Sequence, residues 1–354
     1  MSDSLLIDAA DDIMAPVCTH DALRAAERDG FAPAAWTAVA QAGLPWISVP
    51  EAVGGEGGDI ADALSVLRVA GRHGLPLPLA ETGVLAGWLC SASGLAVARV
   101  PTTVAPGDGL AWRDGTARGV ARLVAWGRSA EQIVALVSAA DGPVVAVFDT
   151  ADLRVERHVN VAGEPRDTVY FDGAAPRASA PAGPGVSAGA LRRRGVLSRV
   201  VLMSGAIRQI LDITVRYTGE RQQFGRRIAR FPAVQQHLVH IAQQAALLGM
   251  AADLACAAAA VDSALAGPEA LFQLASAKAI AHDAAMTATS AAHQAHGAMG
   301  MTQEYPLHHV TRRMWAWTRE YGTGAQAAED VGALVIERGA DALWPMITSG
   351  GALT

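Results

Sequence analysis

The segment YTGERQQFGRRIARFPAVQQHL, residues 217–238, combines an arginine, Arg221, with nearby glutamine side chains. Apolar residues recur with helical spacing over 196–220 and again over 233–266, so this segment spans a helix end, a break and a new helix start. Arg221 lies beside Gln223 at the break. A guanidinium at such a position suits a diphosphate, because it binds phosphate oxygens through paired hydrogen bonds.

The pattern continues toward the C-terminus. Helical spacing predicts further helices over 268–297, 307–319 and 325–338, and the GTG at 322–324 breaks the last two apart. Four or more long helices joined by short loops are typical of an antiparallel bundle.

The first hundred residues also favour helices. We expect helical structure over 21–41, broken near Pro33, and two further helices over 60–73 and 80–91. Between the helices expected over 21–41 and 60–73 lies WISVPEAVGGEGGD, residues 46–59. Its four glycines and one proline predict a loop.

The middle of the chain has a different character. Between about residues 101 and 184, short apolar runs alternate with Gly, Pro and Asp, and five of them have strand length: VARLVAWG, QIVALVSA, PVVAVFDT, DLRVERHV and DTVYFDG. Regularly spaced short strands indicate a small sandwich or barrel. The Pro/Gly/Ser/Ala segment at 178–190 predicts a connector. The expected fold is therefore mostly α with a middle β-domain, divided into residues 1–100, 101–185 and 186–354.

Composition excludes several classes of protein. The net charge of -6 argues against nucleic-acid binding, which requires a basic face. Two basic clusters, Arg192 to Arg194 and Arg226, Arg227 and Arg230, are either phosphate-binding or solvated helix ends. Three widely spaced cysteines predict neither a zinc site nor a disulfide framework. They suit a reducing cytoplasm.

Neither a signal peptide nor a membrane-spanning helix is expected. The N-terminus is acidic and lacks the basic and apolar regions of a signal peptide. Charged residues are expected to interrupt the apolar stretches before they reach membrane-spanning length. The sequence therefore predicts a cytoplasmic protein without membrane insertion.

Three segments resemble the acyl-CoA dehydrogenase family. The first is similar to Y-x-x-x-R-x-Q-F-G-x-x-I-x-x-F-x-x-V-Q, through Tyr217, Arg221, Gln223, Phe224, Gly225, Ile228, Phe231, Val234 and Gln235. The second, residues 293–323, matches a glycine-rich family segment through Gln294, Gly297, Gly300, Glu304, Pro306, Arg312, Gly322 and Thr323. The third is the loop GLPWISVPEAVGGEGGD near the N-terminus, and ASAKA with Lys278 also fits.

The resemblance implies FAD, held partly across a subunit interface, in a homo- or hetero-oligomer such as a dimer or tetramer. It places Arg221, Gln223 and Phe224 at the FAD diphosphate and its surroundings. By the same resemblance, Gln294, Gly297 and Ala298 approach the FAD of the neighbouring subunit, and Thr323 lies near the diphosphate or ribose. The structural alternatives are that Phe224 only packs the bundle and that Gly297 and Gly300 are ordinary turn glycines.

The chemistry that the resemblance implies is α,β-dehydrogenation of an acyl-CoA thioester, with an electron-transfer flavoprotein as acceptor. A carboxylate removes the α-proton and the β-hydride goes to flavin N5. Burial would help such a carboxylate by raising its pKa. The family's base usually lies in a Y-E-G-T turn, where this chain has Glu320-Tyr321-Gly322-Thr323. Tyr321 takes the base position and Glu320 precedes it by one residue, a rotation of about 100° on a helix.

Glu320 is the one base that the sequence nominates. Its structural alternative is a surface carboxylate paired with Arg319 or Arg312. A second place for the base, near Gly195 and Val196, is closed because no Asp or Glu occurs between Asp172 and Asp212. A tyrosine of pKa about 10 would need strong help to ionise.

The middle domain departs further from the family. Its Y-x-x-T-E-P-x-A-G-S-D segment is missing, and VPTTVAPGDG stands in that region. Trp126 falls where the family borders the isoalloxazine ring, so it is either a flavin neighbour or a packed core tryptophan. These losses resemble shortened family members that pair as heterotetramers, share each FAD site and act on large thioesters, including those with steroid side chains.

Four functions therefore stay open. The chain is a catalytic subunit with Glu320 as base, or a partner subunit that contributes part of the FAD site without a base. The same fold could also serve a flavin monooxygenase or a nitroalkane-oxidising enzyme. The last alternative is a helical scaffold without flavin, against which the cluster of Arg221, Gln223 and Phe224 argues.

Overall fold

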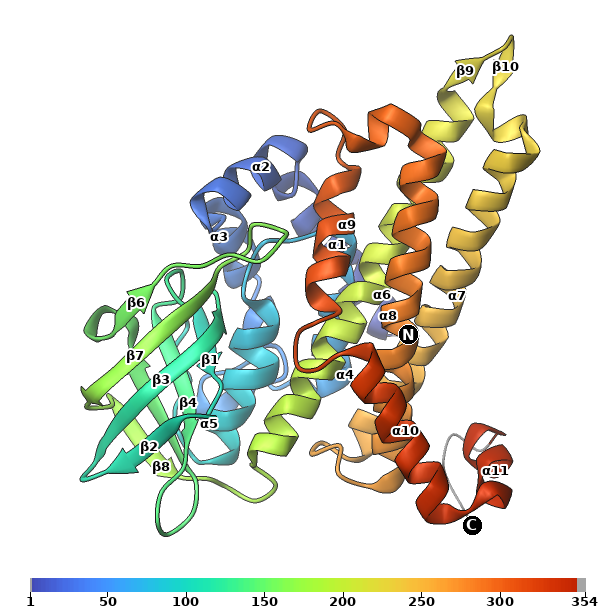
Figure 1. The fold of residues 1–354 in the computed structure, drawn as a ribbon. Coiled ribbons are helices and arrows are strands. Elements are labelled where there is room, and N and C mark those ends of the chain that lie inside the picture. Colours follow the sequence, from blue (N-terminus) through green and yellow to red (C-terminus); the bar gives the residue numbers. More distant parts are fainter. Residues whose placement is uncertain (1, 349–354) are drawn as a thin grey trace. The chain divides into compact units, whose positions relative to one another are not determined.

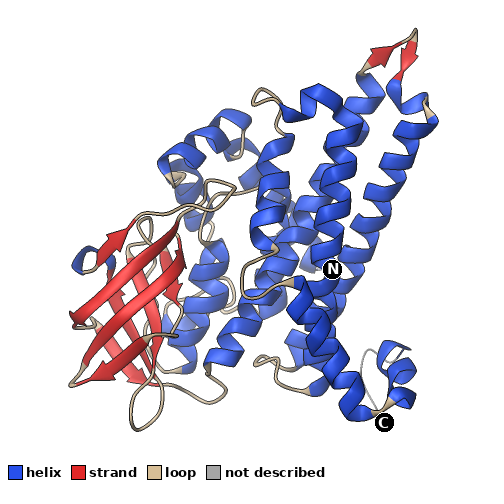
Figure 2. Cartoon of the chain, viewed as in Figure 1, coloured by secondary structure: helices blue, strands red, loops and turns tan. Residues whose placement is uncertain are grey.

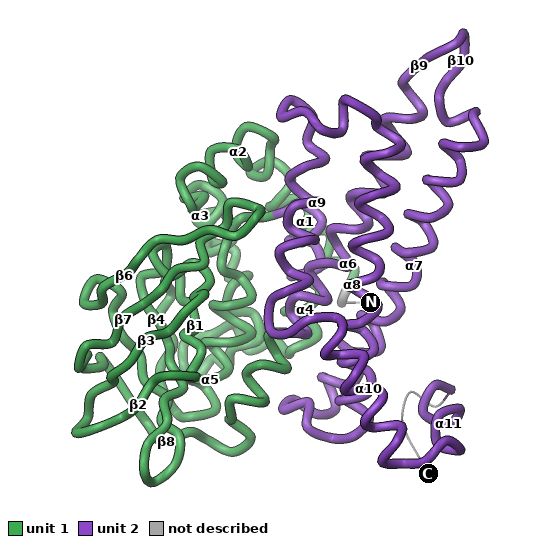
Figure 3. Tube along the Cα trace, in the orientation of Figure 1, with its two compact units in different colours: residues 1–66, 75–195 green, residues 67–74, 196–354 purple. Residues whose placement is uncertain are grey.

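The computed structural model describes residues 2–348. The chain divides into two compact units, Met1–Val66 with Leu75–Gly195, and Leu67–Gly74 with Val196–Thr354 (Figure 3). Helices dominate, and most strands gather in one region in the middle of the chain, apart from a short hairpin at residues 222–227 (Figure 2). The expected fold, mostly α with a middle β region and C-terminal helices, is confirmed.

The first unit opens with the helices α1 (Ser2–Met14), α2 (His20–Asp29) and α3 (Pro33–Gln41). Thr19 caps α2 by accepting a hydrogen bond from Ala22 N, and Gly30 ends it with φ 82°. Pro33 then begins α3, where its missing N–H costs nothing. The predicted break near Pro33 is therefore confirmed.

Helix α4 (Ile60–His73) has the predicted bounds. The stretch predicted as a helix over 80–91 is instead a π-helix, η4 (Ala80–Gly87), followed by α5 (Trp88–Ala92). Every residue of η4 is buried. It packs closely on the 3-10 helix η2 (Leu44–Trp46), since a Cβ on Gly83 would lie 2.3 Å from the Pro45 carbonyl oxygen. The wider π turn leaves no mark in apolar spacing, so the sequence pattern missed it.

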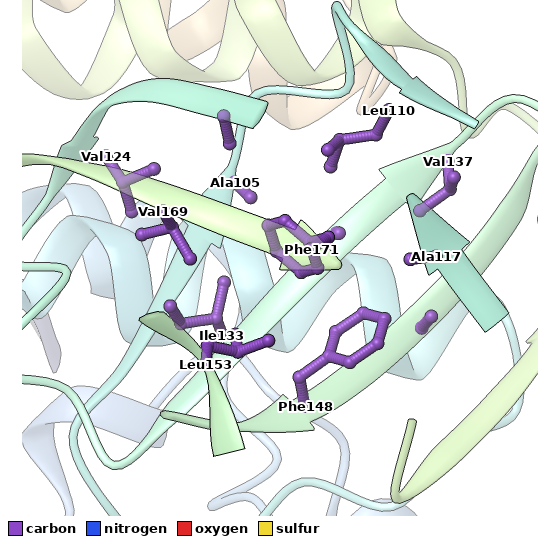
Figure 4. Packing of buried hydrophobic residues seen from close by; sticks show 13 residues of the cluster. Ala105, Leu110, Ala117, Val124, Ile133, Val137, Phe148, Leu153, Val169 and Phe171 are labelled. Carbon is purple, nitrogen blue, oxygen red and sulfur yellow. The ribbon is translucent and has the colours of Figure 1, made fainter. Parts of the chain in front are cut away.

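The middle region forms two four-stranded sheets, ordered β1-β4-β5-β8 and β2-β3-β7-β6. The bounds are β1 (Thr102–Ala105), β2 (Leu110–Arg113), β3 (Thr116–Ala125), β4 (Gln132–Val137), β5 (Val144–Asp149), β6 (Arg154–Glu156), β7 (Arg166–Ala174) and β8 (Ala178–Pro181). Pairing is antiparallel except between β1 and β4. One buried apolar cluster joins both sheets, with Phe148 and Phe171 edge to face at 5.0 Å (Figure 4).

Three of these strands were not predicted. β1 and β2 have four residues each and are flanked by Pro and Gly, so their period-2 pattern is too short to recognise. β8 lies inside the expected connector at 178–190, and α6 begins there as well. Backbone pairing with β5 overrides the Pro/Ala composition of β8.

The second unit is a helical bundle with α6 (Ala188–Glu220, whose first turns belong to the first unit), α7 (Pro232–Val261), α8 (Pro268–His296), α9 (Leu307–Trp317), α10 (Gly324–Arg338) and α11 (Leu343–Thr348) (Figure 1). α7 and α8 pack along one another over their length. Gly71 and Gly205 let α4 and α6 approach closely. A Cβ on Gly205 would lie 1.9 Å from the Arg68 carbonyl oxygen.

Helix α7 corrects one expectation from the sequence. Its 30 residues include an 18-residue window with mean hydropathy 1.6, long and apolar enough to cross a membrane. Charged residues therefore do not interrupt every apolar stretch, because Asp253 is the one Asp, Glu, Lys or Arg in this helix. Length and composition alone do not show that a helix spans a membrane, and α7 packs against α8.

Candidate cofactor and catalytic site

The break after α6 is a β-hairpin. β9 (Gln222–Gln223) pairs antiparallel with β10 (Arg226–Arg227), and the hairpin projects beyond the ends of α6 and α7 (Figure 1). Phe224 and Gly225 form its tip with φ 52° and 78°. A left-handed conformation is unusual for a bulky residue. The Phe224 side chain is nevertheless 90% exposed, so it does not pack the bundle of its own chain.

The hairpin gathers cationic side chains around two rings. Arg221, Arg226 and Arg227 are exposed. The Arg226 guanidinium lies 4.2 Å from the Phe231 ring centre, and Phe231 meets Phe224 edge to face at 6.1 Å. Guanidinium groups and exposed aromatic faces of this kind suit an anionic, planar ligand.

The second predicted segment lies at the C-terminal end of α8. Gln294 and Ala298 are exposed, and Gly297 ends the helix with φ 61°. The Tyr217 ring stacks on His296 with centres 4.4 Å apart, and Tyr305 packs against both rings. Since Tyr217 precedes Arg221 by one helical turn, this stack joins the two segments.

The third predicted group lies where α9 gives way to α10. Glu320 accepts a hydrogen bond from Arg199 Nε to its Oε2 at 2.5 Å. The Arg199 side chain is only 2% exposed and that of Glu320 17%. Glu320 is therefore held in an ion pair with a buried guanidinium from α6, whereas the sequence suggested Arg319 or Arg312 as its partner.

Lys278 supports the same turn from α8. Its Nζ donates hydrogen bonds to the carbonyl oxygens of Trp317 at 3.1 Å and Glu320 at 2.9 Å. Burial lowers the Lys278 pKa to about 8, against the opposing effect of the Glu320 charge. A buried ammonium at this place adds hydrogen bonds to carbonyl groups at and just beyond the C-terminal end of α9.

Thr323 caps α10. Its hydroxyl accepts from Gln326 N at 3.2 Å, while the Gln326 side-chain oxygen accepts from Thr323 N at 2.9 Å. Between Glu320 and this capping box, Tyr321 has φ 59° and Gly322 has φ 115°. The turn therefore passes through two successive left-handed residues.

The predicted cofactor residues do not form one cluster within the chain. Lys278, which holds the Glu320 turn, and Gln294 are 16 residues apart on α8, about 24 Å at 1.5 Å per residue. Trp126 belongs to the first unit, is 4% exposed and has φ 58°. Its place as a flavin neighbour stays a prediction.

The two basic clusters differ in environment. Arg226, Arg227 and Arg230 are exposed. Arg194 is buried, donates from Nε to the Val84 carbonyl oxygen at 3.0 Å and lies over the Trp88 ring, and burial lowers its pKa to about 10. Arg194 is therefore part of the core of the first unit and not a solvated helix end.

Sequence reasoning missed Arg199 and His296. Arg199 is the lone charge in the apolar run VLSRVVLM, and a charge in such a run is usually buried and paired. That signal could have identified it, although not its partner 121 positions away. His296 lies between two matched motif residues and gave no separate signal.

Comparisons with known proteins identify the family. The family model "Acyl-CoA dehydrogenase, C-terminal domain" matches residues 194–334, and "Acyl-CoA dehydrogenase, N-terminal domain" matches residues 2–94. The chain is 28% identical over 295 residues to the acyl-CoA dehydrogenase IpdE2 of Mycolicibacterium smegmatis, covering 81% of this chain and 84% of that protein.

Two solved structures share the fold. One is the ChsE4-ChsE5 complex from Mycobacterium tuberculosis, with TM-score 0.85, 23% identity and coverage of 95% of this chain and 97% of that one. The other is a variant of the Tcur3481-Tcur3483 steroid ACAD, with TM-score 0.83, 23% identity and coverage of 96% and 99%. From its matched domains and its fold, this chain belongs to the acyl-CoA dehydrogenase family.

Proposed function

We propose that this chain is one subunit of a heteromeric, FAD-dependent acyl-CoA dehydrogenase, and that it contributes part of a shared flavin site while another subunit supplies the base. The observation that carries the proposal is the separation of the predicted cofactor residues. The hairpin with Arg221 is tied to the C-terminal end of α8 through the Tyr217–His296 stack. The turn before Thr323 is tied to α8 through Lys278, which is about 24 Å along that helix from Gln294. Each group would therefore serve a different FAD molecule.

An exposed apolar face on α7 supports assembly. Val239, Leu247, Met250, Leu254 and Val261 are each about half exposed or more. Helical spacing places four of these residues on one face: Leu247, Met250, Leu254 and Val261. The one acidic residue of α7, Asp253, is paired with Arg68 at 2.5 Å. Apolar stripes of this length mark protein–protein contacts. The complexes to which the fold is similar carry the names of two different chains, which favours a second dehydrogenase subunit as the partner.

The residues of this chain fit part of an FAD site. Exposed Arg221 and Gln223 would bind the diphosphate, and Phe224 would cover an apolar part of the cofactor. The resemblance assigns Gln294, Gly297 and Ala298 to the FAD of the neighbouring subunit. Because the Tyr217–His296 stack ties them to the hairpin, we propose that the hairpin approaches that same cofactor. Bound FAD supplies the acceptor for the β-hydride of an acyl-CoA thioester.

Glu320 as the base is the alternative. Its carboxylate would have to leave Arg199, and breaking this ion pair with a buried guanidinium is costly. The pairing therefore favours a base from the other subunit. We further propose a cytoplasmic location and an electron-transfer flavoprotein as the acceptor.

The test uses the assembled complex with FAD as the ligand. Arg221→Gln should raise the FAD dissociation constant about 10- to 100-fold, the size expected for a charge-assisted hydrogen bond. Arg208→Gln, an exposed arginine elsewhere on α6, is the matched control and should change it less than twofold. Equal affinity for both variants would show that the hairpin does not hold the cofactor.

A further inference from the structure

The geometry points to Arg199, Lys278 and Glu320 as a positioning cluster that sets the conformation of the turn between α9 and α10, with Glu320 acting as an anchor and not as a proton acceptor. The inference rests on the proposed function only for the flavin contact of Thr323. The cluster itself stands on contacts within the second unit.

Glu320 is held at both of its polar ends. Its carboxylate accepts from Arg199 on α6, and its main-chain carbonyl accepts from Lys278 on α8. Lys278 also binds the Trp317 carbonyl in the last turn of α9. Two buried cations from two helices therefore converge on one residue that follows a third helix.

The residue directly after this anchor has an unusual backbone. Tyr321 has φ 59°, and Arg199 Cζ lies 5.4 Å from its ring centre. A side chain other than glycine keeps such a conformation only where its surroundings hold it. The arginine that binds the Glu320 carboxylate also lies over the Tyr321 ring, so one side chain contacts both residues.

The turn then delivers Thr323 to the start of α10. Gly324 lies so close to α8 that a Cβ there would be 2.4 Å from the His282 Cβ. The start of α10 is therefore held against α8. Only Tyr321 and Gly322 separate Glu320 from the N-cap residue Thr323, so the positions of Tyr321 and Thr323 depend on where Glu320 is held.

A base and an anchor respond differently to the same substitutions. Glu320→Gln removes basicity but keeps an oxygen that can accept from Arg199, whereas Glu320→Ala removes both. If Glu320 anchors the turn, Glu320→Gln should keep the conformation of the turn and Glu320→Ala should lose it. If it is the base, glutamine is as damaging to turnover as alanine.

Amide hydrogen exchange of residues 318–326 in the full chain measures the turn directly. We expect at least tenfold faster exchange in Glu320→Ala, a change below threefold in Glu320→Gln, and none in the control Glu329→Ala, an exposed carboxylate on α10. Arg199→Gln should accelerate amide exchange of these residues as much as Glu320→Ala does. Should the Arg199 variant fail to fold, the two Glu320 variants decide the matter.

The assembled complex provides the second readout. Turnover of acyl-CoA by Glu320→Gln should stay within tenfold of the wild type. Unchanged exchange in Glu320→Ala, or normal exchange with a thousandfold loss of turnover in Glu320→Gln, would overturn the positioning role. Absence of FAD from the complex would refute the proposed function but not the positioning role of Glu320, because the exchange experiment does not depend on flavin.

Discussion

The Tyr217 and His296 rings stack with centres 4.4 Å apart and planes 21° from parallel. The first ring is in the last turn of α6, four residues before Arg221, and the second ends α8 next to Gly297. A substitution at this stack should therefore affect both predicted cofactor segments together.

Tyr217→Ala tests the stack. Loss of a partly buried ring should lower the free energy of unfolding by about 2–3 kcal/mol, from lost burial and ring contact. Tyr217→Phe is the control, since it removes only the 3.4 Å hydrogen bond to the His296 carbonyl and should cost less than about 1 kcal/mol. Urea unfolding distinguishes them. Equal stability of the two variants would mean that the rings contribute nothing.

His296 makes the same place sensitive to acid. Burial lowers its pKa below the ordinary 6.5, and His293 adds to this; the ring is 4% exposed and its Nδ1 lies 2.8 Å from the Ala292 carbonyl oxygen. Tyr217 and Tyr305 are the other titratable groups against it.

Because the unfolded state binds this proton more readily, stability should fall as pH drops below about 6.5. His296→Phe should lose less stability than the wild type between pH 7 and pH 5, as followed by urea midpoints. Parallel pH profiles would contradict a buried neutral imidazole.

Lys278 should make the free energy of unfolding depend on pH in the alkaline range. Its pKa is lowered from 10.5 to about 8 in the folded chain, so the unfolded state binds more protons between these values. Stability attributable to this group should therefore rise with pH across that window, by on the order of 1–3 kcal/mol.

Lys278→Met removes the group and should abolish that rise. Unfolding free energies of both proteins at pH 7.5, 8.5 and 9.5 provide the measurement, with Arg199 and Glu320 unchanged in each. A constant difference between them across this range would show that Lys278 keeps its ordinary affinity for protons.

Gly205 tests the close approach of α4 and α6. Since a Cβ would lie 1.9 Å from the Arg68 carbonyl oxygen, Gly205→Ala should force the helices apart and cost about 2–3 kcal/mol. Gly332→Ala is the matched control in α10, where nothing lies within 4 Å of the added carbon. It should stabilise the chain by up to about 1 kcal/mol. Thermal unfolding that moves both variants alike would refute the close contact.

Sequence patterns predicted the long helices well, but they did not predict the elements that depend on contacts with distant segments. The bounds of α4 and the break at Pro33 follow from apolar spacing and local caps, which depend on neighbouring residues. The π-helix η4 and the strand β8 depend on packing and pairing with distant segments, so their own residues did not reveal them.

The candidate site shows the same division. Arg221, Gln223 and Phe224 were recognisable from one continuous motif, and the structure places them on one hairpin. The pairing of Arg199 with Glu320 joins residues 121 positions apart, and no local pattern encodes it. For that reason the sequence nominated Glu320 as a base, whereas its contacts favour a positioning role.

The most direct measurement is the visible absorption spectrum of the chain purified alone, followed by anaerobic addition of mixed acyl-CoAs. A subunit that holds only part of each flavin site should be colourless, or yellow without bleaching, and should bleach only when the second dehydrogenase subunit is present. A flavin band that bleaches with this chain alone would contradict the shared site and make Glu320 the residue to test as its base.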